Sequence, residues 1–338
     1  MGKNNQGGSD GGGGARSGNS SGGNRNKDTI DLEEVAGTAD VDLDLGDVDD
    51  DGNVTAEIDT DGDGTTDETV EIELPDDNTI TITGTDGDNM LIGGDGDDTF
   101  EGSAGDDTVI GGDGEDTIDY SDLDAPISIS SAGVLDKGDL GVDVLGTFDV
   151  ATGSIEVVET VIGDKGEQNV VDATSVQGAV AIDVDLSSGA FTGILIEDAG
   201  DFSVGDTFSL SLENFVDVLG TDNDDLITGD KDDNLLTGAA GEDSIDGGSG
   251  DDTISGGTDE DILTGGNGDD VFEFVAGDGS DVITDFEVGE DELVVDGFDA
   301  SDLDVATDGT DTTITYDDSE VLLQGVSVED FDSLTLIA

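Results

Sequence analysis

The chain has 338 residues and carries 89 acidic side chains against 7 basic ones, with no histidine, cysteine or tryptophan. This balance makes nucleic acids and anionic membrane surfaces poor partners, and divalent cations good ones. The missing side chains exclude disulfides, cysteine nucleophiles, histidine-based zinc proteases and Ser-His-Asp hydrolases. No apolar run is long enough to span a membrane, and we expect no cleavable secretory signal because the N-terminus lacks an apolar core.

Two segments of different character precede the repeats described below. Residues 1–28 consist mainly of Gly, Ser and Asn, which predicts a disordered, flexible tail. In residues 29–83, apolar and polar side chains alternate at 41–45 and at 79–83, with acidic turns between. We predict a β-rich region there.

Residues 59–67 of that region carry acidic side chains at the spacing D-x-D-x-D-G-x-x-D, and the candidate ligands are Asp59, Asp61, Asp63 and Asp67. This spacing resembles the first nine positions of an EF-hand calcium loop. The bidentate Glu expected at position 12 is replaced by Val70, and the flanks resemble strands. A partial copy begins at Asp47 and continues through Asp49, Asp51 and Gly52. Calcium loops and plain acidic turns both remain open for these segments.

Residues 84–119 and 220–273 consist of four and six consecutive blocks of nine residues. Each block has Gly at position 1, Asp or Asn at position 6 and a large apolar residue at position 8. The position-6 residues are Asn89, Asp98, Asp107, Asp116, Asp225, Asn234, Asp243, Asp252, Asp261 and Asp270. The position-8 residues are Leu91, Phe100, Val109, Ile118, Ile227, Leu236, Ile245, Ile254, Leu263 and Phe272. Such phase-locked apolar positions have no reason to exist in a solvated linker, so we predict a folded repeat.

The block pattern predicts a turn followed by a short strand. Glycine lets the first six residues turn with their carbonyls inward, and the position-6 carboxylate adds a hard anionic oxygen that suits calcium. The candidate carbonyl donors are Gly93, Gly94, Gly96, Gly111, Gly112, Gly114, Gly247, Gly248, Gly250, Gly265, Gly266 and Gly268. Residues 7–9 form a strand whose middle side chain faces the core. At position 5, Asp251 is expected to point to solvent.

The regions after each array are predicted to be β-rich. In residues 120–219, alternation predicts strands at 180–186 and 208–212, and GDKGEQNVV from Gly163 is a decayed block with Gln168 at position 6. This region either continues the repeat structure without most metal turns or forms a separate β-domain. Residues 274–338 include GDGSDVITDFEVGEDELVV and strand patterns at 312–316 and 321–323. We expect a C-terminal cap, because an open repeat end exposes unpaired strand edges.

The nonapeptide closely resembles the GGxGxDxUx unit of the RTX (repeats-in-toxin, hemolysin-type) calcium-binding family. The resemblance implies an all-β parallel β-roll in which two blocks form one coil. Each ion would then lie between blocks i and i+2, held by carbonyls of positions 1–4 and two position-6 carboxylates, with about six ions in the two arrays. The segment from Gly277 resembles the end of RTX proteins exported by type I secretion machinery, so the C-terminal region is also expected to carry the export signal.

We therefore expect a secreted, extracellular or surface-associated calcium-binding protein without enzymatic activity. Its folding is expected to require extracellular calcium, and its role to be structural or adhesive, through self-assembly or a surface or matrix polysaccharide. The alternative is a calcium-binding module of a polysaccharide-acting enzyme, because carboxylate pairs are abundant. Against it, the chain has only two Tyr and no Trp for stacking on sugars.

Overall fold

The computed structural model describes residues 29–31, 41–45, 53–59, 68–73, 79–123, 125–129, 134–145, 147–149, 154–156, 160–165, 168–174, 180–195, 207–299, 302–327 and 335–337. Within these ranges the chain forms two large β-sheets, one two-stranded sheet and a single 3-10 turn, η1 (Gly138–Leu140). No helix in these ranges is long and apolar enough to cross a membrane.

Each large sheet has 15 strands among the described residues. The first sheet contains β1 (Thr29–Asp31), β5 (Thr81–Thr83), β7 (Thr99–Glu101), β9 (Thr117–Asp119), β15 (Thr160–Ile162), β17 (Val180–Asp185), β18 (Ala190–Leu195), β19 (Thr207–Glu213), β21 (Leu226–Thr228), β23 (Ser244–Asp246), β25 (Ile262–Thr264), β27 (Ser280–Ile283), β29 (Asp304–Thr307), β30 (Thr312–Tyr316) and β31 (Ser319–Leu323). The second contains β2 (Val41–Leu45), β3 (Asn53–Asp59), β4 (Glu68–Glu73), β6 (Asn89–Asp95), β8 (Thr108–Asp113), β10 (Ser128–Ile129), β11 (Val134–Asp136), β12 (Val142–Leu145), β16 (Asn169–Asp172), β20 (Phe215–Leu219), β22 (Leu235–Ala240), β24 (Thr253–Thr258), β26 (Val271–Phe274), β28 (Glu292–Val295) and β32 (Thr335–Ile337). The small sheet pairs β13 (Thr147–Asp149) with β14 (Ser154–Glu156).

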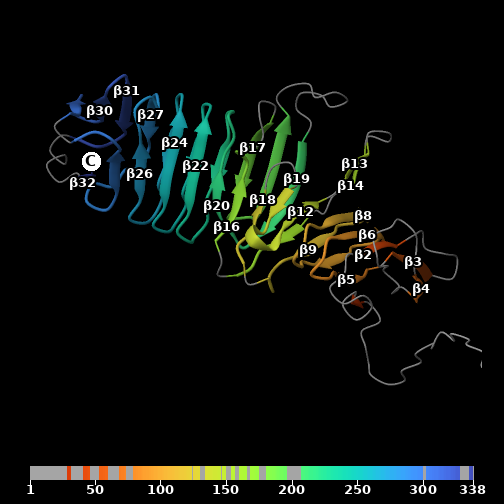
Figure 1. Cartoon of the computed structure of the whole chain (residues 1–338). Helices are drawn as coiled ribbons and strands as arrows, with labels where there is room; N and C mark the ends of the chain where they lie inside the picture. The colour runs from red at the N-terminus through yellow and green to blue at the C-terminus, as the bar shows by residue number, and fades with distance from the viewer. Residues whose placement is uncertain are drawn as a thin grey trace, which may run out of the picture.

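Consecutive blocks of the arrays contribute strands to the two sheets in turn, so two blocks complete one coil. Strands β21, β23, β25 and β27 are parallel neighbours in the first sheet, and β22, β24, β26 and β28 in the second. Ile227 therefore lies opposite Ile245, eighteen residues later. The coils stack along the long axis of an elongated molecule (Figure 1). This all-β, mostly parallel arrangement confirms the β-roll.

The core lies between the two large sheets. All ten position-8 side chains are buried in it and at most 2% exposed. They join one continuous hydrophobic cluster whose buried members run from Ile80 to Val326. Burying an Ile, Leu or Phe side chain contributes about 1.5–3 kcal/mol, so the repeated apolar position explains why each block contributes a strand.

Apart from β13 and β14, the strands of residues 120–219 lie in the same two sheets, between those of the two arrays. They include antiparallel neighbours, because β10–β11–β12 and β17–β18–β19 are consecutive antiparallel strands. Parallel pairing resumes at β12 with β8, β10 with β16 and β17 with β21. The sheets thus continue through this region, but hairpins replace the repeated glycine turns.

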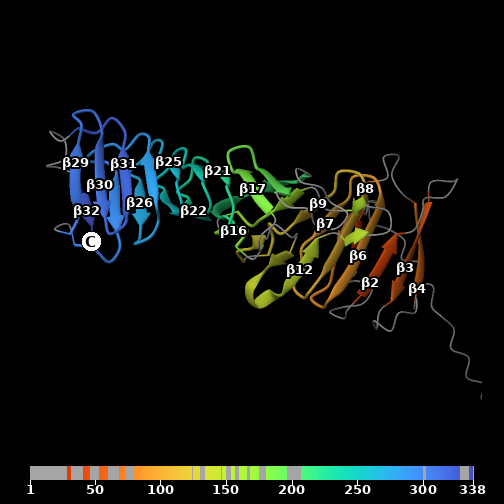
Figure 2. The ribbon, with the colours of Figure 1, turned by 90° about the horizontal axis from the view of Figure 1, so that it is seen from above.

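Antiparallel strands also lie at the two ends of the roll. Strands β2, β3 and β4 lie at one end, and β29, β30 and β31 lie at the other, where β32 pairs in parallel with β28 (Figures 1 and 2). At the second end, the Tyr316 ring lies edge-on to Phe298 at 5.6 Å and tilted against Phe274 at 6.5 Å. These strands form the expected C-terminal β cap.

Candidate metal centre

The position-6 side chains of both arrays are brought into two stacked rows inside the turns. All ten are buried, with at most 3% exposure. In one row the Asp225 N–H donates to Asp243 Oδ1 (2.7 Å), and the Asp243 N–H donates to Asp261 Oδ1 (2.9 Å). In the other, Asn234 donates to Asp252 (2.8 Å) and Asp252 to Asp270 (2.9 Å). The carboxylates therefore link blocks i and i+2, the pairing that the sequence resemblance implies.

The second carboxylate oxygen of these side chains faces the glycine at position 1 of its own block. A Cβ on Gly238, Gly247 or Gly256 would lie under 3.0 Å from Oδ2 of the Asp five residues later. The Oδ2 atoms of Asp243, Asp252 and Asp261 accept no hydrogen bond. A buried anionic oxygen without a donor is costly, so the geometry fits a bound cation.

The backbone of each turn stacks directly on the turn of the neighbouring coil. The Ser249 N–H donates to Asp230 O (2.9 Å), and Asn267 N–H donates to Gly248 O (3.0 Å). Gly250 has a φ of 134°. A Cβ there would lie under 3.0 Å from Asp232 O. Glycine thus permits both the positive φ and the close approach of turn carbonyls.

The other proposed carbonyl donors occupy equivalent places. A Cβ would lie under 3.0 Å from a carboxylate or carbonyl oxygen at Gly93, Gly111, Gly114, Gly247, Gly248, Gly265, Gly266 and Gly268. Gly94 and Gly112 lie opposite each other in β6 and β8. Gly96 has a φ of 111° and presents its carbonyl to Gly114.

The donor set is therefore composed of carboxylate and carbonyl oxygens, which calcium prefers. Among the described residues, no three acidic side chains converge on one point. Backbone carbonyls would have to complete the coordination of an ion held by two position-6 carboxylates.

Burial raises the pKa of the stacked carboxyls. The pKa rises to about 8 at Asp243, about 7 at Asp252 and about 6 at Asp261 and Asp270, mainly through desolvation. Neighbouring carboxylates raise it further, while hydrogen bonds from the backbone oppose the rise. Without a metal, Asp243 and Asp252 would hold protons near neutral pH, and calcium would compete with those protons.

Two carboxylates that continue the rows escaped the sequence analysis. The Asp261 N–H donates to Asp281 Oδ1, and the Asp270 N–H donates to Asp291 Oδ1, both at 3.1 Å. Asp281 lies 20 residues after Asp261, and Asp291 lies 21 residues after Asp270. A search for a nine-residue period therefore does not find them. The sequence feature that could have identified Asp281 and Asp291 is an Asp two residues before an apolar side chain, here the buried Ile283 or Leu293.

A fifth block of the first array was also missed. Residues 138–146 read GDLGVDVLG. The Asp107 N–H donates to Asp143 Oδ1 (3.0 Å), and Leu145 lies opposite Val109. An inserted hairpin places Asp143 36 residues after Asp107 instead of 18, which hides the block from a periodic search.

The decayed block at Gly163 has a different position-6 equivalent from the one predicted. Gln168 is exposed, whereas Asn169 is fully buried and accepts the Ile127 N–H at 3.0 Å. The turn is one residue longer than the nonapeptide, so Asn169 takes the buried position.

Position 5 has a structural role that the sequence analysis overlooked. Asp251 is exposed as expected, but its Oδ1 accepts the Asp269 N–H (3.0 Å), and its own N–H donates to Asp233 Oδ1 (2.8 Å). All ten blocks have Asp or Glu at position 5, and this recurrence could have indicated a structural role for the position. The outer acids thus form a second ladder, whose hydrogen bonds run opposite to those of position 6.

Of the candidate EF-hand-like ligands, Asp59 lies among the described residues. Asp59 ends β3, opposite Asp42 in β2. The other three candidates, Asp61, Asp63 and Asp67, lie outside the described residues, as does the copy at Asp47, Asp49, Asp51 and Gly52.

A family model described as the RTX calcium-binding nonapeptide repeat matches residues 83–118, 219–254 and 246–283. No curated protein matches the chain.

Three solved structures are similar to parts of the chain. The extracellular lipase LipA of Serratia marcescens is 19% identical with a TM-score of 0.31, covering 77% of this chain and 40% of the lipase. The AlgE6R2 subunit of the Azotobacter vinelandii mannuronan C5-epimerase is 30% identical with a TM-score of 0.28, covering 36% of this chain and 91% of the subunit. The AlgE6R3 subunit of that epimerase is 26% identical with a TM-score of 0.28, covering 35% and 80%.

This chain spans less than half of the lipase. The family assignment itself rests on the repeats. The glycine turns, the buried position-6 rows and the position-8 core all coincide with the segments that the family model matches. Residues 83–118 and 219–283 of this chain are RTX calcium-binding nonapeptide repeats, and these repeats bind calcium.

Proposed function

We propose that the chain is a secreted, non-enzymatic calcium-binding protein that folds outside the cell and has a structural or adhesive role there. The observation that carries this proposal is the pair of buried carboxylate rows in the second array, where Oδ2 of Asp243, Asp252 and Asp261 faces turn glycines without a hydrogen-bond donor. Proteins of this family are typically secreted.

Calcium would decide folding because the rows of the second array crowd buried acidic groups that have no buried counterion there. In the second array, the exposed Lys231 contacts only Asp230 and Asp232 on the surface. A site at ten times its dissociation constant contributes about 1.4 kcal/mol to stability. About six such sites would therefore contribute about 8 kcal/mol, which equals the net stability of a typical domain.

The calcium affinity typical of extracellular modules favours folding outside the cell. Extracellular calcium modules bind with dissociation constants of about 10⁻⁴ to 10⁻³ M, so submicromolar cytosolic calcium would leave the sites empty. The second array would remain unfolded, and the chain thus competent for type I export, until it reached external calcium. Residues 274–338 would carry the export signal.

The structural role is favoured by the shape and chemistry of the described part of the chain. The stacked coils form an elongated body, and at each end one of the two sheets finishes in antiparallel strands (Figure 1). Both tyrosines are buried, which removes the aromatic side chains best suited to stacking on sugars.

Far-UV circular dichroism of the full chain tests calcium-driven folding. We expect a largely unordered spectrum in excess chelator and a β-rich spectrum at millimolar calcium, with magnesium as the control ion. A spectrum that is equally β-rich in chelator would refute the proposal. Incubation with uronate polysaccharides then tests the absence of enzymatic activity, because product formation would favour the enzyme module instead.

A further inference from the structure

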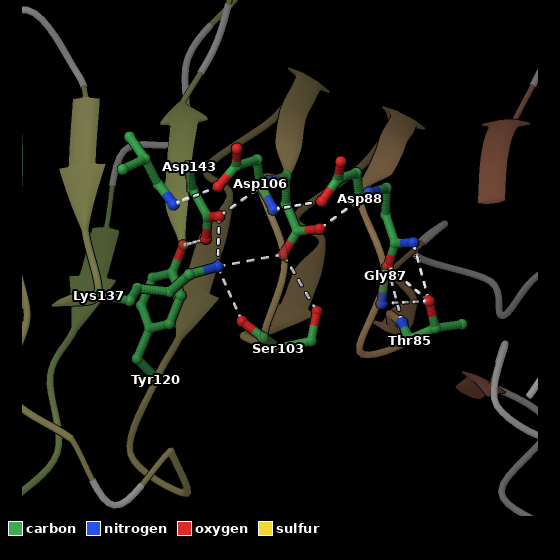
Figure 3. A network of polar contacts seen from close by, with 11 residues as sticks. Thr85, Gly87, Asp88, Ser103, Asp106, Tyr120, Lys137 and Asp143 are labelled. Carbon is green, nitrogen blue, oxygen red and sulfur yellow. Dashed lines mark hydrogen bonds and ion pairs between the residues drawn. The ribbon is translucent and has the colours of Figure 1, made fainter. Parts of the chain in front are cut away.

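One row of turns in the first array differs from the rows of the second array because every oxygen of its carboxylates contacts a donor or a cation of the protein. This row contains the turns that end at Asn89, Asp107 and Asp143 (Figure 3). We propose that the ammonium group of Lys137 occupies the place of a calcium ion in this row, so that these turns close without metal.

The contacts of Lys137 match the donor set expected for an ion. Its side chain is fully buried, and its Nζ lies 3.2 Å from Asp107 Oδ2 and also pairs with Asp143 Oδ1. The Nζ donates to the backbone carbonyl of Ser103 at 2.8 Å. Two position-6 carboxylates from stacked blocks and one turn carbonyl therefore surround a single positive charge.

The remaining oxygens of the two carboxylates are also satisfied. Asp107 Oδ1 accepts the Asn89 N–H (2.9 Å), and Asp107 Oδ2 accepts the Ser103 hydroxyl (3.1 Å). Asp143 Oδ2 accepts the Tyr120 hydroxyl at 2.5 Å. The Lys137 Nζ lies 5.9 Å from the centre of the Tyr120 ring, so the ring adds a cation–π contact. No oxygen of either carboxylate remains without a hydrogen-bond donor or a cation.

The next turn in the row is closed by a neutral side chain. Asn89 Oδ1 accepts the Thr85 N–H at 2.7 Å, and Asn89 Nδ2 donates to the Thr85 hydroxyl at 3.0 Å. An amide brings no negative charge to the row. The turns at Asn89, Asp107 and Asp143 thus contain their own donors and their own cation.

The second array provides the contrast within the same chain. Asp243, Asp252 and Asp261 occupy equivalent positions, yet their Oδ2 atoms have no donor. Its single lysine, Lys231, is 77% exposed and contacts only surface carboxylates. Lys137 comes from the inserted hairpin that precedes η1, so the insertion that breaks the repeat period also supplies the cation.

The first test counts the calcium ions bound to the full chain at saturation by equilibrium dialysis. We expect Asp107→Asn to bind as many ions as the wild type, whereas Asp252→Asn binds fewer. Lys137→Ala opens space between Asp107 and Asp143, so we expect it to bind an additional ion. Lys231→Ala removes the same charge from the surface and should leave the count unchanged. Loss of an ion from Asp107→Asn would overturn the proposal.

Hydrogen exchange provides the second test and does not depend on the ion count. In chelator we expect the wild-type amides of Asn89, Asp107 and Val144 to be protected, and those of Asp243 and Asp252 to exchange rapidly. In Lys137→Ala the first set should be protected only in calcium, while Lys231→Ala should match the wild type. Protection in chelator that survives Lys137→Ala, or that is absent from the wild type, would overturn the role of Lys137.

Discussion

Positions 5 and 6 of one block carry the same side chain in two different environments. Asp252 is buried with an Oδ2 that has no donor, whereas Asp251 is exposed and accepts one backbone N–H. Only the first fits a calcium ligand. Removing the Asp251 carboxylate removes a hydrogen bond worth about 0.5–1.5 kcal/mol, and it also relieves charge repulsion.

We therefore expect Asp252→Ala to raise the calcium concentration at the folding midpoint by about tenfold or more, because ligand charge sets the affinity. Asp251→Ala should shift it by less than about twofold, since its hydrogen bond and its repulsion offset each other. Calcium titrations followed by circular dichroism measure both midpoints. Equal shifts in the two variants would show that the assigned register is wrong.

The raised pKa values predict opposite effects of pH with and without calcium. The metal-free folded state holds protons at Asp243 up to about pH 8, whereas an unfolded Asp releases them near pH 4. Folding without metal is therefore favoured by these groups at acid pH. This contribution is complete below about pH 4 and is lost as pH rises to the folded-state pKa values of about 6 to 8. With calcium, rising pH removes the competing proton and tightens binding.

In chelator we accordingly expect more β structure at pH 5 than at pH 8. In calcium, the midpoint concentration should fall by up to about tenfold per pH unit between pH 6 and 8. Asp243→Asn, whose amide does not titrate, should weaken both dependences. More β structure in chelator at pH 8 than at pH 5 would contradict the assignment of these buried carboxyls.

At the scale of the strand, burial should decide stability independently of the metal. Ile254 is fully buried at position 8, while Leu226, at position 7, is 46% exposed. We expect Ile254→Ala to cost about 2–5 kcal/mol and Leu226→Ala less than about 0.5 kcal/mol. Urea unfolding of the full chain at saturating calcium measures both. Similar costs for the two would mean that position 8 does not face the core.

Sequence periodicity predicted the elements wherever the period is unbroken. Gly at position 1 and the apolar side chain at position 8 recur because each coil repeats the same turn and the same core contact. Asp143, Asp281 and Asp291 could not be found in this way, because inserted residues change the spacing to 36, 20 and 21 while the hydrogen-bonded row continues. A row is defined by contacts between coils, which tolerate insertions that a fixed count does not.

The sequence also did not predict that both oxygens of the Asp107 carboxylate are hydrogen-bonded and that one pairs with Lys137. Lys137 lies 30 residues after it and belongs to a hairpin with no repeat signature. The Gln168 assignment failed for a related reason, since a single added residue moved Asn169 into the buried place. Local insertions therefore limited the prediction of the site more than they limited the prediction of the fold.

At the scale of the whole molecule, export and folding should depend on different parts of the chain. We expect residues 274–338 to direct a heterologous passenger out of cells that carry the cognate type I exporter. The same passenger joined to residues 220–273 should stay inside. Immunoblots of cells and medium distinguish the two. Equal export of both fusions would place the signal elsewhere.

The stacking of coils also determines how the molecule would bear tension. In a linear stack each coil contacts only its neighbours, so a pull along the long axis passes through every junction in series. The interstrand hydrogen bonds lie along that axis and would be loaded directly (Figure 1). Junctions bridged by calcium would then weaken when calcium falls, whereas the junction between the coils of Asp107 and Asp143, bridged by Lys137, would keep its strength. Under tension at low calcium, the coils of the second array would therefore separate first.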